Sequence, residues 1–133
     1  MDLADIRAGL VTALGTISGL HVFAVERASN AMPCAFPGDP SVAYHTTMGD
    51  LVQVEFPVVV EIANVSDDDA AGKADDYLSP SHASSIKTAI ELDETLGGVC
   101  SSLIVREGES HVRERSNDTA TRAITFGITI LAA

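Results

Sequence analysis

Acidic residues gather at positions 67–76, where their spacing partly resembles a calcium-binding loop. With Asp67 at the first loop position, Asp69 falls at the third and Gly72 at the sixth. The twelfth position, where such a loop requires a bidentate Glu, is occupied by Leu78. Because the ligand that closes the calcium cage is missing, we interpret these carboxylates as the solvated start of a helix and predict no metal site.

Other catalytic patterns are also missing from the sequence. The four histidines lie more than twenty residues apart: His21, His45, His82 and His111. A zinc site built from them would need long-range convergence that the spacing does not indicate. The chain contains neither a glycine-rich nucleotide-binding motif nor a GxSxG turn. Asp93 and Glu94 are adjacent carboxylates at the end of a predicted helix, where we expect them to be exposed. We therefore predict a protein without catalytic residues or cofactors, and not an enzyme.

The composition indicates one globular domain with a strong negative charge. The chain has 133 residues, of which 46% are hydrophobic, and its formal net charge is −11. Binding to a nucleic-acid backbone as a main activity is disfavoured, because it needs clustered cations. The N-terminus does not resemble a secretory signal, and no apolar stretch reaches the roughly 18 residues of a membrane span, so we expect neither. Cys34 and Cys100 are expected to be free thiols.

The first third of the chain predicts one helix and two short strands. Apolar residues recur every three or four positions along residues 2–16, which is typical of an amphipathic helix: Leu3, Ile6, Leu10, Leu14 and Ile17. A short strand is expected at residues 20–25. Residues 33–36 lie between prolines and predict only a brief or edge strand.

Residues 51–62 give the clearest strand signal, since every even position is hydrophobic. Gln53, Glu55 and Glu61 occupy odd positions, so we expect them on the solvated face. Pro57 has no N–H, which predicts a sheet edge or a bulge at that position.

Two central helices are predicted next. Ser66 has the character of an N-cap for the first of them. The inner stripe of this helix is predicted from its spacing: Ala70, Ala74, Tyr77 and Leu78. The second is expected at residues 84–92, with Ile86, Ala89 and Ile90 facing inward.

The last part of the chain predicts a pair of strands at residues 99–106 and 121–131. The polar residues 107–119 between them predict a hairpin loop or arm. The whole chain, residues 1–133, is thus expected to form one α+β domain. Its sheet is predicted to be mostly antiparallel or mixed, with four to five strands, and with the N-terminal helix and the two central helices packed on it.

Several segments in this order resemble the tail terminator, or tail completion, proteins of long-tailed siphophages, particularly those that infect actinobacteria. The resemblance extends over nearly the whole chain and is most specific in its middle part. The segments are ISGLHVF at 17–23, MPCAF at 32–36, FPVVV at 56–60, YLSP at 77–80, SIKTAIE at 85–91 and LGGV at 96–99.

The resemblance implies a structural role in the virion and not catalysis. Proteins of this family form a homohexameric ring that caps the tail tube, ends its polymerisation and joins the tail to the head-side connector. The implied partners are other copies of the chain, the major tail tube protein and a head-side stopper or connector protein. The implied location is the tail or neck of the virion, after assembly in the host cytoplasm, with no membrane involved.

A closed ring needs a heterologous interface, in which one patch of each subunit meets a different patch on the next. Half of the chain's cations lie close together in sequence: Arg106, Arg113, Arg115 and Arg122. With Glu107 and Glu109 they form our candidate subunit or partner interface. The alternative is that residues 107–119 are only a solvated loop.

Six copies of a chain with net charge −11 carry about 66 negative charges. An acidic lumen would let the genome pass without binding it specifically, although a low pI is also a general solubility trait. Another head–tail neck component, such as a stopper or head-completion protein, is the alternative function. A small hydrolase or ligand-binding domain is a third class, and it would need a pocket with convergent polar groups.

Overall fold

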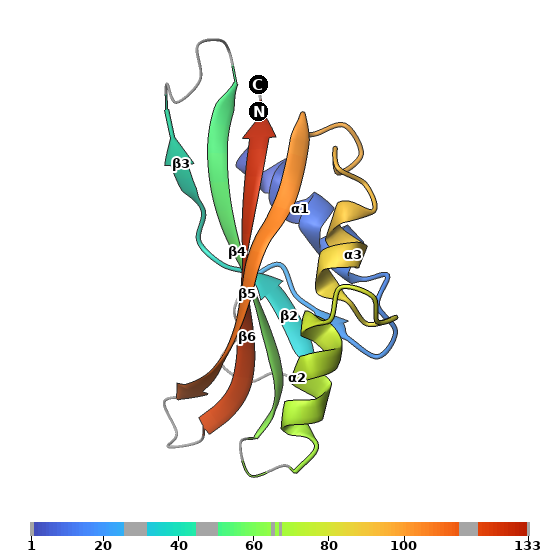
Figure 1. The fold of residues 1–133 in the computed structure, drawn as a ribbon. Coiled ribbons are helices and arrows are strands. Elements are labelled where there is room, and N and C mark those ends of the chain that lie inside the picture. The colour runs from blue at the N-terminus through green and yellow to red at the C-terminus, as the bar shows by residue number, and fades with distance from the viewer. Residues whose placement is uncertain are drawn as a thin grey trace.

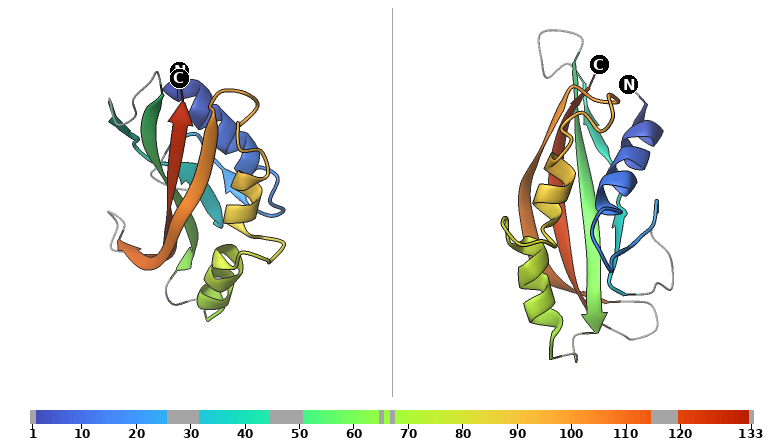
Figure 2. Two further views of the ribbon diagram at one scale, coloured as in Figure 1. Left: turned by 45° about the horizontal axis from the view of Figure 1, so that its top comes forward. Right: turned by 90° about the vertical axis from the view of Figure 1, so that its right-hand side faces the viewer.

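The computed structural model describes residues 2–25, 32–44, 51–64, 66, 68–114 and 120–132. Three helices cover one face of a mixed six-stranded sheet, so the chain has the predicted α+β fold (Figures 1 and 2). The elements in chain order are α1 (Leu3–Leu14), β1 (His21–Val22), β2 (Cys34–Pro37), β3 (Ser41–Ala43), β4 (Val52–Asn64), α2 (Ala70–Leu78), α3 (Ile86–Glu91), β5 (Ser102–Glu114) and β6 (Ala120–Ala132).

The sheet is built around β4 and β6, which pair along almost their whole length. The strand order is β1-β2-β4-β6-β5, and β3 also pairs with β4. Strands β2 and β3 occupy successive parts of the same side of β4, with Pro37 opposite Val58 and Ser41 opposite Glu55. Among the strand pairs of the described residues, β1 and β2 run parallel and the others are antiparallel.

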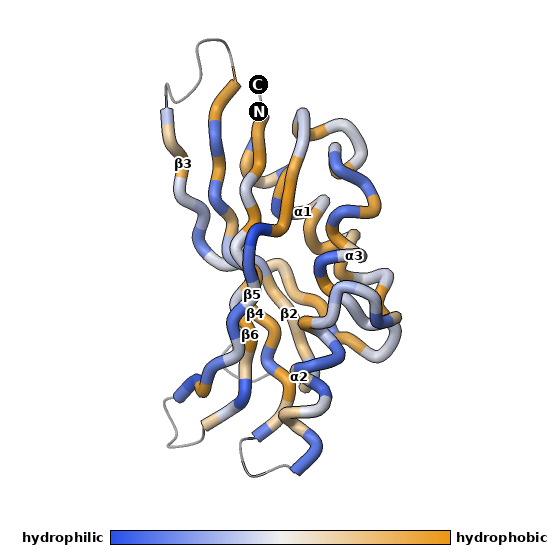
Figure 3. Tube along the Cα trace, in the orientation of Figure 1, coloured by the Kyte–Doolittle hydropathy of each residue, from blue (hydrophilic) through white to orange (hydrophobic). Residues whose placement is uncertain are grey.

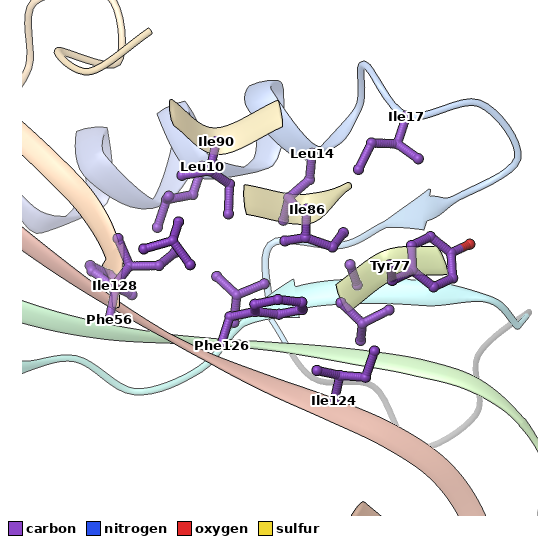
Figure 4. Close-up of a cluster of buried hydrophobic side chains, with 14 of the residues drawn as sticks. Leu10, Leu14, Ile17, Phe56, Tyr77, Ile86, Ile90, Ile124, Phe126 and Ile128 are labelled. Atoms are coloured by element: carbon purple, nitrogen blue, oxygen red, sulfur yellow. The ribbon is translucent and has the colours of Figure 1, made fainter. Parts of the chain in front are cut away.

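The hydrophobic core lies between the sheet and the helices. Side chains alternate across a strand, so the even positions of β6, and those of β4 from Val52 to Ile62, point to the helix-covered face. The largest of them are fully or almost fully buried: Phe56, Ile62, Ile124, Phe126, Ile128 and Ile130. Figure 4 shows the side chains of α1, α2 and α3 reaching this layer from the other side. One continuous cluster of buried residues extends from Ile6 to Ala132.

The helices follow the predicted apolar stripes, with one difference at a helix start. The predicted buried residues of α1 (Ile6, Leu10 and Leu14) and of α2 (Ala70, Ala74 and Tyr77) are buried. Asp2 caps α1 by accepting from the N–H of Ala4, and Ser85 caps α3 by accepting from the N–H of Thr88. The predicted N-cap Ser66 is wrong: α2 begins at Ala70, and Asp69 is its N-cap residue. Two further carboxylates precede Ala70, so the sequence offers several residues that could cap this helix.

Strand β2 lies inside the sheet, between β1 and β4, and all four of its residues are buried. Of the two alternatives predicted for residues 33–36, the brief strand is confirmed, since β2 has four residues, and the edge position is wrong. The prolines are compatible with an internal strand because they lie at the start and end of this short segment, where few ladder hydrogen bonds are needed.

Pro57 lies in the middle of β4, a central strand, and the expected edge or bulge at this residue is also wrong. Its carbonyl accepts from the N–H of Gly38 at 2.7 Å. The nitrogen and carbonyl of one strand residue point to the same side, so the missing N–H faces the break between β2 and β3. The register shift of β4 against β6 occurs between Glu61 and Ala63 instead.

The hairpin of β5 and β6 is longer than the sequence predicted. Residues 107–114, assigned to a loop or arm, continue β5 and pair with β6 from Gly127 to Ala120. Both sides of this segment are mostly exposed, so its sequence is as polar as that of a loop (Figure 3). The segment forms a strand because its partner, β6, continues to alternate between apolar and more polar residues along this stretch. Residues 115–119 of the predicted loop lie outside the described residues.

Across the described ranges, the helices are too short or too polar to cross a lipid bilayer.

Candidate interaction face

The face of the sheet opposite the helices is the candidate functional surface. In Figure 1 all three helices lie on one side of the sheet, and we call the other side the open face. The odd positions of β6, and those of β4 up to the register shift after Glu61, belong to this open face, because their even neighbours point into the helix-covered core. Cross-strand partners share a face, so residues 107, 109, 111 and 113 of β5 also lie on the open face, opposite residues 127, 125, 123 and 121 of β6.

A buried ion pair lies at one end of the open face. Glu61 of β4 is fully buried, and its carboxylate accepts from Nη1 of Arg113 at 3.3 Å. The hydroxyl of Thr121 donates to the same carboxylate at 3.2 Å. The guanidinium of Arg113 also lies 5.5 Å from the ring centre of Phe36. Four strands therefore meet at one buried charged group, and its contacts couple the positions of these strands.

The burial of Glu61 corrects the expectation that this residue lies on a solvated face. Alternation identifies the face on which a residue lies but not whether that face is covered. Here the side chain of Arg113 lies against Glu61.

A second polar cluster lies further along the same face. The hydroxyl of Thr129 lies 2.9 and 3.0 Å from the two carboxylate oxygens of Glu55 and donates to this group. Arg106 donates from Nε to the Thr129 oxygen at 2.7 Å, and Gln53 donates to Glu55 at 2.9 Å. These contacts join β4, β6 and β5 by side-chain hydrogen bonds in addition to the backbone ladder. The open face therefore has an ordered polar surface.

Between the two clusters the open face is hollowed at Pro57 and Gly127. The hollow has a volume of about 350 Å³, and four carboxylates are among the residues that line it: Asp39, Glu55, Glu107 and Glu109. Gly127 contributes no side chain, which opens the floor between neighbouring strands. The hollow suits a cationic side chain of a partner. Within the described ranges, no group of three or more His, Cys, Asp or Glu side chains is arranged to hold a metal ion.

The structure brings together four of the six residues predicted as an interface. Arg106, Glu107, Glu109 and Arg113 all lie on the open face of β5. Arg122 does not join them, because it shares the parity of Ile124 and lies on the helix-covered face, opposite Ala63 and Val112. Arg115 lies outside the described residues.

Sequence reasoning missed Thr121 and Thr129 as members of these clusters, although it placed Glu55 and Glu61 on the same face as each other. The signal was present in the alternation of β6, where three threonines occupy odd positions: Thr121, Thr125 and Thr129. Sequence alone did not reveal the register that sets Thr129 opposite Glu55.

The carboxylate of Asp93 accepts several hydrogen bonds within the loop after α3. This group accepts from the hydroxyl and N–H of Thr95 at 2.9 and 3.1 Å and from the N–H of Gly97 at 2.8 Å. The hydrogen bond from the Thr95 hydroxyl, followed by those from the backbone N–H groups, lowers the pKa of Asp93. Asp93 and Glu94 are exposed, as predicted.

Leu96, in the same loop, has a φ of 49°, and its buried side chain lies against Gly9 of α1. A Cβ added at Gly9 would come within 2.9 Å of the Leu96 Cβ.

Cys34 and Cys100 are both buried, and they form no disulfide with each other. Burial, with a smaller effect from Asp93, raises the pKa of Cys100.

Neither the models of known protein families nor the curated proteins include a match to this sequence.

Proposed function

We propose that this protein is a structural component of a siphophage virion that caps the tail tube as a homohexameric ring. In this role it ends tail polymerisation and joins the tail to the head-side connector. The observation that carries the proposal is the contrast between the two sides of the sheet. One side is covered by helices, and on the other side the described residues form an ordered polar face with a charged edge strand.

The subunits of a ring need two different contact surfaces, and the two sides of this molecule offer such surfaces. A heterologous contact joins one patch to a different patch on the next copy. The open face offers the acidic hollow between β3, β4, β5 and β6. The helix side offers a hollow of about 270 Å³ between α1 and α3, next to the exposed side chain of Leu92. These two surfaces differ in chemistry and lie on opposite sides of the sheet.

Three of the six segments that resemble tail terminator proteins lie close together on the helix side of the fold. The YLSP segment ends α2, the SIKTAIE segment is α3 with its N-cap, and the LGGV segment is the turn organised by Asp93. All three lie on the helix side, beside α1 and β5 (Figure 2).

The charge is compatible with a conduit for DNA. The chain carries a net charge of −11, and a ring of six copies would repel the phosphate backbone of a genome that passes through it. An acidic composition that serves only solubility is the alternative explanation of this charge. Selective neutralisation of carboxylates in assembled particles would separate the two explanations.

Electron microscopy of particles assembled without this protein tests the proposal. We expect tails of irregular, extended length that do not join heads, and we expect the wild-type gene to restore normal virions. Tails of normal length that fail to join heads would favour the alternative function, another neck component such as a stopper or head-completion protein. Normal tails joined to heads would contradict both functions.

A binding experiment separates the two neck functions directly. A tail terminator is expected to retain purified tail tube protein, and a stopper is expected to retain the head-side adaptor.

A pair of double variants tests whether the acidic hollow is part of the subunit interface. The variant Glu55→Gln/Glu107→Gln removes two carboxylates from the acidic hollow, and the matched control Asp75→Asn/Glu94→Asn removes two exposed carboxylates on the helix side of the molecule. Loss of ring formation in the first variant alone would assign the hollow to the subunit interface.

A further inference from the structure

The far end of the β5–β6 hairpin carries an exposed apolar side chain beside a cation. We call residues 110–114 of β5 and 120–124 of β6 the hairpin end. Val112 and Arg122 are direct cross-strand partners on the same side of the sheet as the helices, so their side chains are neighbours. The helices leave this part of the sheet uncovered, since Val112 is 52% exposed.

Arg122 is half-buried and forms no hydrogen bond or ion pair within the described residues. The carboxylate of Glu114, which shares this side of the hairpin end, lies opposite Ala120 and does not pair with it. A charge that is partly removed from water is more stable beside an opposite charge. The hairpin end therefore suits a surface that combines apolar side chains with carboxylates.

The hollow of about 270 Å³ between α1 and α3 has this complementary chemistry. It is lined mostly by small side chains, and Leu92 at its rim is 79% exposed, more than any other large apolar side chain in the described ranges. The charges here are acidic. Asp93 lines the hollow, and Asp5 lies one helical turn before Gly9 on the same face of α1. None of the described lining residues carries a positive charge.

The nearest cations on the two helices are directed elsewhere. Arg7 of α1 donates to the carbonyl groups of Pro37 and Gly38, and Lys87 of α3 pairs with Glu91. The acidic rim of the hollow is therefore not neutralised by the helices that form it, and it is open to a cation from another molecule.

The hairpin end and the hollow cannot meet within one chain. In Figure 1, α1 and α3 lie beside the upper half of the sheet, and the hairpin end lies at the bottom. Val105, which α3 contacts through Glu91, is separated from Val112 by roughly 20 Å of extended strand. Contact between these two complementary surfaces therefore requires two copies of the chain.

We propose that the hairpin end of one copy docks into the hollow between α1 and α3 of a second copy. Val112 packs against Leu92 and the small side chains of the hollow. Arg122 lies beside the carboxylates of Asp5 and Asp93. Apolar burial stabilises this contact, and the ion pairs set its orientation.

This contact deepens the proposed function, because it joins two different surfaces, as the subunits of a ring require. As the contact of a ring it rests on that function. It is nevertheless tested between purified copies of the full chain, without tails or heads.

Crosslinking between two variants tests which surfaces meet. The native cysteines are buried, so an added surface thiol is the accessible one. Val112→Cys and Leu92→Cys, mixed and treated with a short bismaleimide, are expected to give covalent dimers, whereas neither variant alone should do so. A mixture of Val112→Cys with Ser81→Cys, in the exposed connection between α2 and α3, is the control and should stay uncrosslinked.

A charge exchange tests the ion pairs. Light scattering across a concentration series measures association, and we expect wild-type oligomers at micromolar concentration. Arg122→Glu and Asp5→Arg should each raise the Kd by at least about tenfold, and the double variant should recover most of the affinity. The control Lys73→Glu makes the same change of charge at an exposed position of α2 and should leave the Kd near the wild-type value.

Three results would overturn the proposed contact. The first is a wild-type chain that stays monomeric up to about 0.1 mM. The second is an oligomer in which the Val112→Cys and Leu92→Cys mixture crosslinks no better than the control mixture. The third is a double charge variant that associates no better than either single variant. A ring without these crosslinks would leave the proposed function intact, and crosslinked copies from a gene whose loss leaves normal virions would retain the contact but not that function.

Discussion

The two faces of the sheet are built by different means. On the helix-covered face, Phe126 and Ile128 are buried by side chains of three helices, and the contacts are apolar and non-directional (Figure 4). On the open face, Glu61, Arg113 and Thr129 are held by directional hydrogen bonds and one ion pair between strands. Apolar burial on the helix face therefore stabilises the fold, whereas directional contacts on the open face couple the strands and present charge.

The largest expected effect is on the helix face. Phe126→Ala removes a large side chain that is 2% exposed, and we expect a loss of about 3–5 kcal/mol in the free energy of unfolding. Its open-face neighbour on the same strand gives the control, because Thr125→Ala removes little buried apolar surface. Chemical denaturation of both variants measures the difference. Equal losses would contradict the division of roles between the two faces.

The ion pair on the open face should have the next largest effect. Arg113→Ala leaves the carboxylate of Glu61 buried without its guanidinium partner, and a quarter of the Arg113 side chain is exposed. We expect a loss of about 2–3 kcal/mol, below the range for a fully buried pair because water partly replaces the lost contact. The double variant Glu61→Leu/Arg113→Met removes both charges and should recover much of this loss in the same denaturation experiment. Failure to recover would mean that Arg113 acts mainly through its contact with the Phe36 ring.

Two glycines give a matched comparison of the faces with a smaller effect. At Gly108, on the helix face, an added Cβ would lie 2.7 Å from a ring carbon of Phe126 and 2.8 Å from a methyl carbon of Leu78. At Gly127, on the open face, the nearest atom would be Cγ of Glu107 at 3.4 Å, and this exposed side chain can move. We expect Gly108→Ala to cost about 1–3 kcal/mol and Gly127→Ala less than about 1 kcal/mol. Thermal unfolding of the two variants checks the order, and a reversed order would contradict the assignment of faces.

The same contrast explains what the sequence could predict. The helix face was predictable because a periodic row of apolar side chains is stable only when it is buried. Ile6, Leu10 and Leu14 therefore had to face a core, as did the even positions of residues 51–62. The open face was only partly predictable. Alternation placed Glu61 on the correct face, but the partner that buries it, Arg113, lies 52 residues away in sequence. Residues 107–114 were assigned to a loop because an exposed edge strand has the polarity of a loop, and only pairing with β6 distinguishes the two.

The smallest expected effect lies outside both faces, in the turn that Asp93 organises. The hydrogen bonds that this carboxylate accepts, first from the Thr95 hydroxyl and then from backbone N–H groups, lower the pKa of Asp93. A lowered pKa means that the ionised form stabilises the fold. This contribution is complete above the pKa of the unfolded chain, about 4 for an ordinary Asp. It is lost as the pH falls through the lower pKa of the folded state. Asp93→Asn should therefore be slightly less stable than wild type at neutral pH, and the difference should shrink steadily in acid. Denaturation of both proteins across this pH range measures the trend, and a difference that stays constant with pH would mean that the Asp93 carboxylate does not contribute as an ion.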